Sequence, residues 1–180
     1  MQRGFGEAAR VLRQGGVVAY PTEYCFGLGC DPRDRDAVLR LLHLKRRAVS
    51  KGLIVLAGDI DQLSFYTDDL PTTVRASWPG PHTWLVTPRA TVPVWITGGK
   101  PKVAVRVTAH SVAAMLCRMA GMAIISTSAN RSGETPARSH REVLRRFGND
   151  IDFVVAGRVG DAPAPTPIRD ATTGTVIRSG

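Results

Sequence analysis

The residues best suited to chemistry in this sequence are hydroxyl, amide and cationic side chains that follow short apolar runs. Residues 124–133 read IISTSANRSG, so two isoleucines lead directly into a run with four hydroxyls and one amide. A turn needs one or two such residues, and this run has more hydrogen-bonding capacity than a turn requires. The excess raises the question of what these hydroxyls bind. The plainer alternative, a strand end with locally satisfied hydroxyls at Ser126 and Ser128, stays open.

Similar polar clusters recur after other apolar runs. PTEYCFGLGCD follows VVAY, RVTAH closes VAVRV, and PTPIRD lies beside two short apolar runs near the carboxyl end. In α/β proteins, ligands bind at the loops outside the strand ends. We therefore expect several of these loops to converge on one pocket lined by hydroxyls, Arg106 and Asn130.

The motifs of several enzyme classes are absent from the sequence. It contains neither the G-x-S-x-G nucleophile elbow nor the G-x-x-x-x-G-K-[ST] phosphate loop, and Cys25 has no adjacent histidine. Gly27 and Gly29 in FGLG are consistent with a plain turn, because a lone G-x-G is weak evidence for phosphate binding. The remaining basic and hydroxyl residues suit reactions in which the protein neutralises charge and positions the substrates, as in nucleotidyl or phosphoryl transfer.

Two further candidates have simpler explanations. The cations at 45–47 could merely terminate a helix, whose carboxyl end favours positive charge. His110 is at a position typical of a helix start or a surface histidine rather than a ligand. An odd number of cysteines argues against a disulfide framework, and Cys25 and Cys30 lack the further ligands that a zinc site requires.

Composition and charge limit the class of protein. The 180 residues predict one domain, 1–180, and no stretch is apolar enough to span a membrane. The amino end lacks the apolar core of a signal peptide, which predicts a cytoplasmic location. The net charge of +9 indicates a polyanionic partner, either RNA, DNA or a polyphosphate substrate.

Strands and helices alternate along most of the chain, which predicts an α/β fold. The predicted helices span residues 7–14, 34–44, 63–78 with a break near Pro71, 110–119 and 139–147. The predicted strands span 17–20, 53–57, 83–87, 103–107, 122–127 and 152–156, with two more near 168 and 176–177. Because some neighbouring strands have no helix between them, we expect an open, mixed sheet flanked by helices.

The ordered motifs PTEYCFGLGCD, LKRR followed by SKGLIVL, WPGPHTWLV, VAVRVTAH, STSANRSG and PTPIRD…VIRSG resemble those of the YrdC-like family. The resemblance covers residues 7–180 and is greatest to the short bacterial form of the family. It implies a YrdC/RibB-like open twisted sheet with a basic concave face. It also implies a reaction in which L-threonine, bicarbonate and ATP give threonylcarbamoyl-adenylate and pyrophosphate.

The resemblance further implies partners and site residues. Mg²⁺ is expected on the ATP phosphates, with no protein metal ligands, and partner proteins are expected to transfer the threonylcarbamoyl group to the adenosine beside a tRNA anticodon. No catalytic acid or base is assigned. The residues implied for ATP are Lys45, Arg47, Arg106, Ser128, Asn130 and Arg178. The residues implied for threonine are Thr22, His110, Ser126 and Thr166.

The sequence departs from the family pattern at several of these motifs. The departures are Cys25-Phe26 for Val-Tyr, Ala48 and Gly52 for prolines, His82 for leucine, Thr108 for proline and Thr166 for serine. They leave the ATP-side cations intact and bear most on the threonine side.

Two rival functions follow from the composition. A double-stranded RNA-binding protein acting in ribosomal RNA maturation would use the positive charge on phosphates. A hydrolase of small phosphates would be active without threonine.

Overall fold

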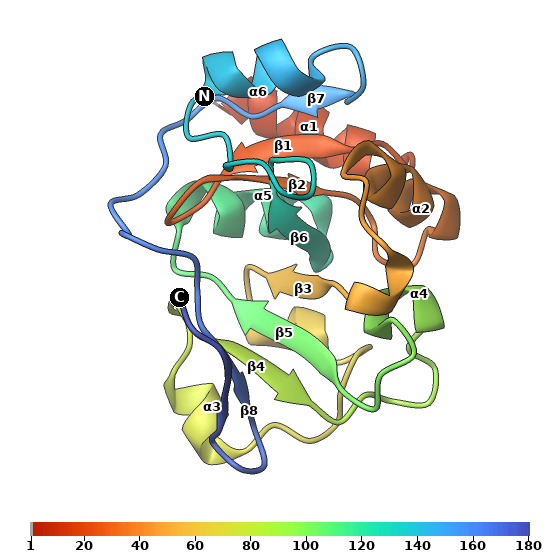
Figure 1. Ribbon diagram of the computed structural model, residues 1–180, viewed down its shortest axis with the longest axis vertical. Coiled ribbons are helices and arrows are strands. Elements are labelled where there is room, and N and C mark those ends of the chain that lie inside the picture. Colours follow the sequence, from red (N-terminus) through yellow and green to blue (C-terminus); the bar gives the residue numbers. More distant parts are fainter. Residues whose placement is uncertain (1) are drawn as a thin grey trace.

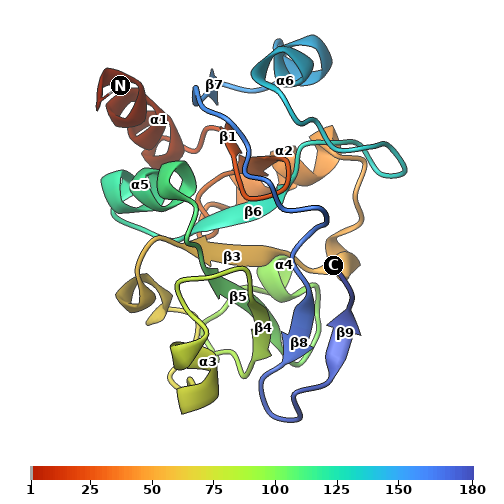
Figure 2. The same cartoon turned by 90° about the vertical axis from the view of Figure 1, so that its left-hand side faces the viewer.

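Residues 2–180 form one mixed sheet of nine strands, in the order β7-β1-β2-β6-β3-β5-β4-β8-β9. Figure 1 labels these strands except β9, which is labelled in Figure 2. This is a computed structural model that describes residues 2–180, with side chains from Gly4 onward. The mixed α/β sheet predicted from the sequence is confirmed. The strands are β1 (Val18–Pro21), β2 (Phe26–Gly29), β3 (Ile54–Ala57), β4 (Thr83–Val86), β5 (Val103–Val107), β6 (Ile124–Ser128), β7 (Phe153–Val154), β8 (Ile168–Asp170) and β9 (Val176–Arg178).

Two of the longer helices begin at residues suited to capping. Asp34 accepts hydrogen bonds from the backbone N–H groups of residues 36 and 37 at the start of α2, and Ser139 forms a capping box with Glu142. Residues 2–180 contain no helix with the length and apolar character needed to cross a membrane. The helical segments are α1 (Gln2–Arg13), α2 (Arg35–Leu44), η1 (Val49–Lys51), η2 (Ile60–Leu63), α3 (Thr72–Ala76), α4 (Val94–Thr97), α5 (Ser111–Ala120) and α6 (His140–Phe147).

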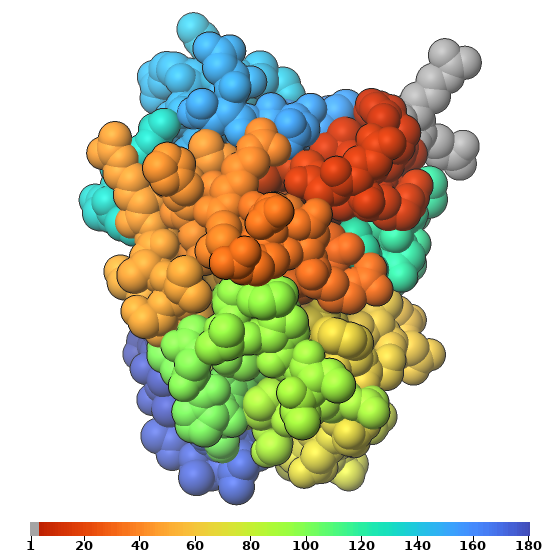
Figure 3. All heavy atoms as spheres, turned by 90° about the vertical axis from the view of Figure 1, so that its right-hand side faces the viewer, coloured from red at the N-terminus to blue at the C-terminus, as the bar shows by residue number. Residues whose placement is uncertain are grey.

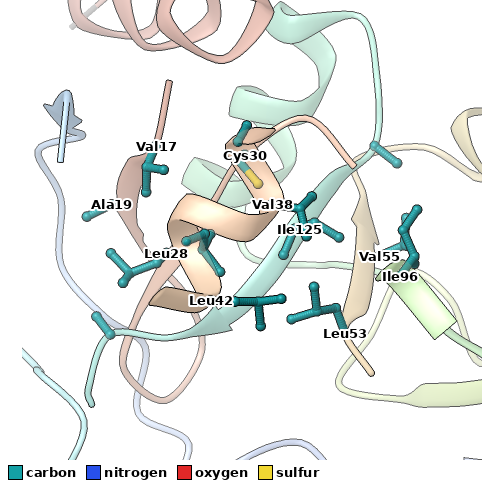
Figure 4. Close-up of a cluster of buried hydrophobic side chains, with 14 of the residues drawn as sticks. Val17, Ala19, Leu28, Cys30, Val38, Leu42, Leu53, Val55, Ile96 and Ile125 are labelled. Atoms are coloured by element: carbon teal, nitrogen blue, oxygen red, sulfur yellow. The ribbon is translucent and has the colours of Figure 1, made fainter. Parts of the chain in front are cut away.

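Helices cover both faces of the sheet, and successive strand residues therefore point into two different cores. Ile124 of β6 belongs to the cluster under α1 and α5, whereas Ile125 belongs to the cluster under α2 and α4. Figure 2 shows α1 and α5 on one side of β6 and β3, with α2 and α4 on the other. Figure 4 shows the second cluster, where Val38 and Leu42 of α2 pack near Ile125. In Figure 3 the orange chain containing α2 and the green chain containing α4 meet on that face.

Two sequence predictions need correction. The sequence suggests a polar loop throughout residues 21–31, but residues 26–29 form β2, which pairs antiparallel with β1 and β6. The two glycines of this segment are typical of a turn. All four residues are buried, however, and tertiary packing stabilises the strand conformation. The helical region predicted through Leu63 and on to Trp78 contains only η2 (Ile60–Leu63) and the short α3 (Thr72–Ala76). Between them, Thr67 bonds the backbone of Asp69 in a turn.

Gly29 allows β2 to lie close to β6. A Cβ built at this position would lie 2.5 Å from the carbonyl oxygen of Ile125. We expect Gly29→Ala to lower the free energy of unfolding by about 1–3 kcal/mol, because backbone must move to admit the methyl group. Chemical denaturation measures this change. The matched control is Gly6→Ala in α1, where a Cβ meets nothing within 4 Å, and it should stabilise the protein by about 0.5–1 kcal/mol. Equal effects from both variants would contradict the prediction.

Candidate active site

A polar pocket opens where the β1–β2 turn, β3, β5 and β6 approach the carboxyl-terminal segment. It encloses about 900 Å³, including solvent at its open mouth. Among the described residues its lining has three arginines and no acidic side chain, so the pocket favours anions. Its polar lining residues are Thr22, Tyr24, Cys25, Arg47, Thr83, Arg106, Ser126, Thr127, Ser128, Thr166 and Arg178.

Most of the site residues that the sequence suggests meet in this pocket. The seven found in its lining are Thr22, Arg47, Arg106, Ser126, Ser128, Thr166 and Arg178. Lys45, Asn130 and His110 are not in the lining. Loops separated by more than a hundred residues therefore converge as expected, and the three exceptions occupy supporting positions.

Lys45 is buried beneath the turn that follows β6. Its ammonium group donates to the carbonyl oxygens of Ser128 and Asn130, the latter at 2.8 Å, and its side chain is almost inaccessible to solvent. Burial, with a smaller contribution from the charge of Arg47, lowers the pKa of Lys45 to about 8. Lys45 thus ties the last residue of β6, Ser128, to the turn at Asn130, instead of lining the pocket.

Asn130 also serves this turn. Its side-chain amide donates to the carbonyl oxygens of Arg131 and Glu134, both at 2.9 Å, while its Oδ1 atom is buried without a protein partner. An unpaired buried acceptor is energetically costly, and this atom lies outside the pocket lining.

His110 caps α5. Its Nδ1 atom accepts a long hydrogen bond, 3.5 Å, from the backbone N–H of Ala113. Burial lowers the pKa of His110, and the nearby carboxylate of Glu23 opposes that shift. His110 therefore lies at a helix start, as one interpretation of the sequence expects, and it is absent from the pocket lining.

Arg106 projects from β5 and is held on three sides. Its Nε–H donates to the carbonyl oxygen of Gly80 at 3.1 Å, Nη1 donates to the hydroxyl of Thr166, and Nη2 forms an ion pair with Glu23. The side chain is 8% exposed. Burial lowers the pKa of Arg106, and the Glu23 carboxylate opposes the shift.

Arg47 and Arg178 form a second cationic region of the pocket. Arg47 donates through Nη2 to the carbonyl oxygen of Gly52 at 2.9 Å, and its Nε atom is buried without a partner. Arg178 donates to the backbone oxygen of Thr166 at 2.7 Å. Burial, followed by the charge of Arg178, lowers the pKa of Arg47. Within residues 2–180 neither arginine has an acidic side chain in ion-pair range, so both offer uncompensated charge to a ligand.

The hydroxyl wall comes from β6. Ser126 and Ser128 are two residues apart on one strand, so both face the pocket, and Ser128 pairs with Gly27 of β2 across the sheet. Thr22 lies on the adjoining turn, where its hydroxyl donates to the carbonyl oxygen of Cys25 at 2.7 Å. The hydroxyl-rich strand end is thus a pocket wall as well as a turn.

Sequence reasoning assigned no role to two residues of this site. Thr83 at the start of β4 lines the pocket, and its buried hydroxyl has no protein partner. Glu23 holds Arg106 from outside the lining. Glu23 lies in the P-T-E motif that the sequence singles out. Its partner Arg106 is 83 residues away, so only the folded structure shows the ion pair.

The departures at 48 and 52 differ in their structural consequences. Ala48 has φ −66°, the angle that a proline fixes, so the backbone shape typical of the motif is kept there. Gly52 has φ +66°, which proline cannot adopt, and its Cβ would lie 3.0 Å from the carbonyl oxygen of Thr97. The loop after Arg47 therefore has a backbone course specific to glycine.

An adjoining groove of about 1020 Å³, counted with its open solvent, shares Arg47, Leu53, Ile54 and Arg178 with the polar pocket. The two hollows therefore meet at a pair of arginines. The groove's other lining residues are Lys51, Gly52, Leu85, Ile96, Thr97, Lys100, Pro101, Lys102, Ala104, Ile168, Asp170 and Ile177. Its floor is mainly apolar and its rim carries lysines.

Metal ligands are not clustered in the structure. Within residues 2–180 no three His, Cys, Asp or Glu side chains are placed to hold one ion. Cys25, Cys30 and Cys117 are buried free thiols, and burial raises the pKa of Cys25 to about 11. The Cys25 thiol in the pocket wall is therefore neutral near pH 7.

Sequence comparison finds close relatives over nearly the whole chain. The Sua5/YciO/YrdC family model, described as "Telomere recombination", matches residues 10–180. A threonylcarbamoyl-AMP synthase from Halorhodospira halophila is 54% identical over 175 residues, covering 95% of this chain and 92% of the relative. Another from Methylococcus capsulatus is 51% identical, covering 95% and 94%.

Solved structures show the same fold. P. abyssi Sua5 complexed with L-threonine superposes with a TM-score of 0.89 at 31% identity, covering 96% of this chain and 52% of that chain. The match thus spans about half of the longer Sua5 protein. E. coli YciO superposes with a TM-score of 0.87 at 25% identity, covering 100% of this chain and 90% of that one.

Proposed function

The chain belongs to the Sua5/YciO/YrdC family, and we propose that its polar pocket performs the reaction of the threonylcarbamoyl-AMP synthases that it resembles. The observation that carries the proposal is a pocket with three arginines, a wall of hydroxyls and no acidic lining residue among those described. L-Threonine, bicarbonate and ATP are the substrates, and threonylcarbamoyl-adenylate and pyrophosphate are the products.

The reaction brings two anions together. The threonine amine and bicarbonate give a carbamate with loss of water. A carbamate oxygen then attacks the α-phosphorus of ATP, and the bond from that phosphorus to the bridging oxygen of the leaving pyrophosphate breaks. Carbamate and triphosphate repel each other, so fixed cations must offset their charge before the reacting atoms approach. No strong general base is needed once the carbamate has formed.

The uncompensated arginines suit the triphosphate. Arg47 and Arg178 lie where the polar pocket meets the adjoining groove, so phosphates bound there would leave the nucleoside over the apolar groove floor. Arg106 on β5 adds a third positive charge and Ser128 a hydroxyl to the same pocket. Asn130 would act through the turn that its amide group holds beside Ser128. Lys45 contributes through the turn that it fixes.

The hydroxyls suit threonine. Thr22, Ser126 and Thr166 line the polar pocket and are absent from the groove, and neutral donors and acceptors match a small amino acid with one hydroxyl. His110 caps α5 outside the pocket lining, so any role in threonine binding would be indirect. Mg²⁺ would be carried by the ATP phosphates and would neutralise charge on the departing pyrophosphate. Partner proteins would consume the labile adenylate in tRNA modification.

Pyrophosphate release tests the proposal. Purified protein is assayed with ATP and Mg²⁺, with L-threonine and bicarbonate each present or omitted. We expect release only when both are present. Release without threonine would point to a nucleotide hydrolase on the same fold. No release from folded protein that binds duplex RNA would favour the nucleic-acid function.

A further inference from the structure

We propose that Glu23 is a positioning residue for this reaction, which fixes the guanidinium of Arg106 in the pocket wall and is itself fixed by Thr108. The inference rests on the proposed function for its kinetic consequences. Its geometric part, the coupling of Glu23, Arg106 and Thr108, stands on the contacts alone.

Arg106 makes three contacts, and one of them carries a negative charge. Two of its three contacts, the carbonyl oxygen of Gly80 and the hydroxyl of Thr166, are neutral acceptors. Glu23 supplies the only countercharge within ion-pair range among the described residues. A guanidinium that is 8% exposed and lacks a countercharge is strongly disfavoured, so removal of the Glu23 charge should displace the group toward solvent.

Glu23 is itself held by hydrogen bonds to its side chain and its backbone. The Oε1 atom that faces Arg106 also accepts a hydrogen bond from the hydroxyl of Thr108 at 2.7 Å. The backbone oxygen of Glu23 accepts from the N–H of Ala162 at 3.1 Å, and the neighbouring oxygen of Thr22 accepts from Gly160 at 2.9 Å. Glu23 is thereby anchored at both its side chain and its backbone.

Glu23 lies outside the set of residues that line the pocket. It is absent from the pocket lining, whereas Arg106 is part of it, so Glu23 acts on a substrate only through the arginine. Thr108 stands where the family pattern has a proline, which has no hydroxyl. A chain with the family's proline at this position could not form the hydrogen bond from Thr108 to Glu23, so this way of holding Arg106 depends on Thr108.

The test combines kinetics with a signal from Arg106 itself. We expect Glu23→Gln, which keeps the shape but removes the charge, to lower kcat/KM by about tenfold or more. Thr108→Val, which keeps the ion pair and removes only the hydroxyl, should lower it by about twofold to fivefold. The ¹⁵N-labelled Nε–H signal of Arg106, identified by its loss in Arg106→Lys, should exchange faster with solvent in Glu23→Gln.

A double-mutant cycle distinguishes positioning from general stabilisation. In the Arg106→Lys background, the planar fork that Glu23 orients is gone, so adding Glu23→Gln should change kcat/KM by less than about twofold. An equal loss in both backgrounds, or an unchanged Nε–H signal with full activity in Glu23→Gln, overturns the proposal. If the unmodified protein shows no threonine-dependent pyrophosphate release, the proposed function fails, while the exchange measurement still decides the Glu23–Arg106 coupling.

Discussion

Arg47→Ala should reduce threonine-dependent pyrophosphate release by about 10²–10³-fold. Arg47 lies at the junction of the polar pocket and the adjoining groove, with no acidic partner among the described residues and with Nε unpaired. Its charge is therefore available to the triphosphate, and no neighbouring carboxylate offsets it. Initial rates at varied ATP concentrations measure the effect, which should be present in kcat as well as KM because charge on pyrophosphate grows as the bond breaks.

Two further variants sharpen this result. Arg47→Lys keeps the charge but loses the planar fork, so it should recover only part of the activity. Arg145→Ala removes an exposed cation from α6 that is absent from both hollows and should leave the rate unchanged. An equal decline in Arg47→Ala and Arg145→Ala would mean that overall positive charge, rather than a local phosphate site, governs activity.

Lys45→Met should lower activity by about 10²-fold although the lysine is outside the pocket lining. The ammonium group ties the carbonyl oxygens of Ser128 and Asn130 together, and methionine fills the space without donating to either. The turn that presents Ser128 would then lose its fixed shape. Steady-state pyrophosphate release measures the loss, and wild-type activity in Lys45→Met would contradict this account of the turn.

The same lysine makes stability depend on pH. Its pKa is about 8 in the folded protein, below the ordinary value of 10.5, because burial disfavours the charged form. Between these pH values the unfolded chain binds a proton that the folded protein has lost, so stability rises with pH. From pH 8 to 10.5 the wild type should gain about 3 kcal/mol relative to Lys45→Met.

Denaturant titrations of both proteins across this range measure the difference, which removes the contributions of tyrosines and cysteines common to the two. Lys100→Met provides the control, since Lys100 is an exposed lysine. The change in relative stability should be larger for Lys45→Met than for Lys100→Met. A constant difference for Lys45→Met would mean that Lys45 is not buried as a charged group.

Much of the fold could be predicted because local signals agree with the packing. Strand β5 has the predicted bounds, and Asp34 and Ser139 cap helices as their residue types suggest. β6 runs one residue beyond its predicted end, so Ser128 belongs to the strand itself. Strand β2 could not be predicted, because its FGLG sequence carries turn signals and is held in the sheet by β1 and β6 on either side.

The site could be predicted as a set of residues but not as an arrangement. Spacing along the chain brought hydroxyls and arginines to one pocket, since strand ends converge in α/β folds. It gave no indication of which way the Lys45 side chain points, because that depends on two carbonyl groups more than eighty residues away. The pairing of Glu23 with Arg106 was hidden for the same reason.

The pocket is built from both an interior strand and an edge strand of the sheet, which should differ in how often they open locally. Ser126 and Ser128 lie on β6, which is paired on both sides within the sheet, whereas Arg178 lies on the edge strand β9, whose Val176 and Ile177 are exposed. Interior strands open only with global unfolding, while edge strands open locally at small free-energy cost. We therefore expect the β6 side of the pocket to open less often than the β9 side, which native-state hydrogen exchange would measure. Nucleotide exchange would then use the mobile edge without disturbing the serines.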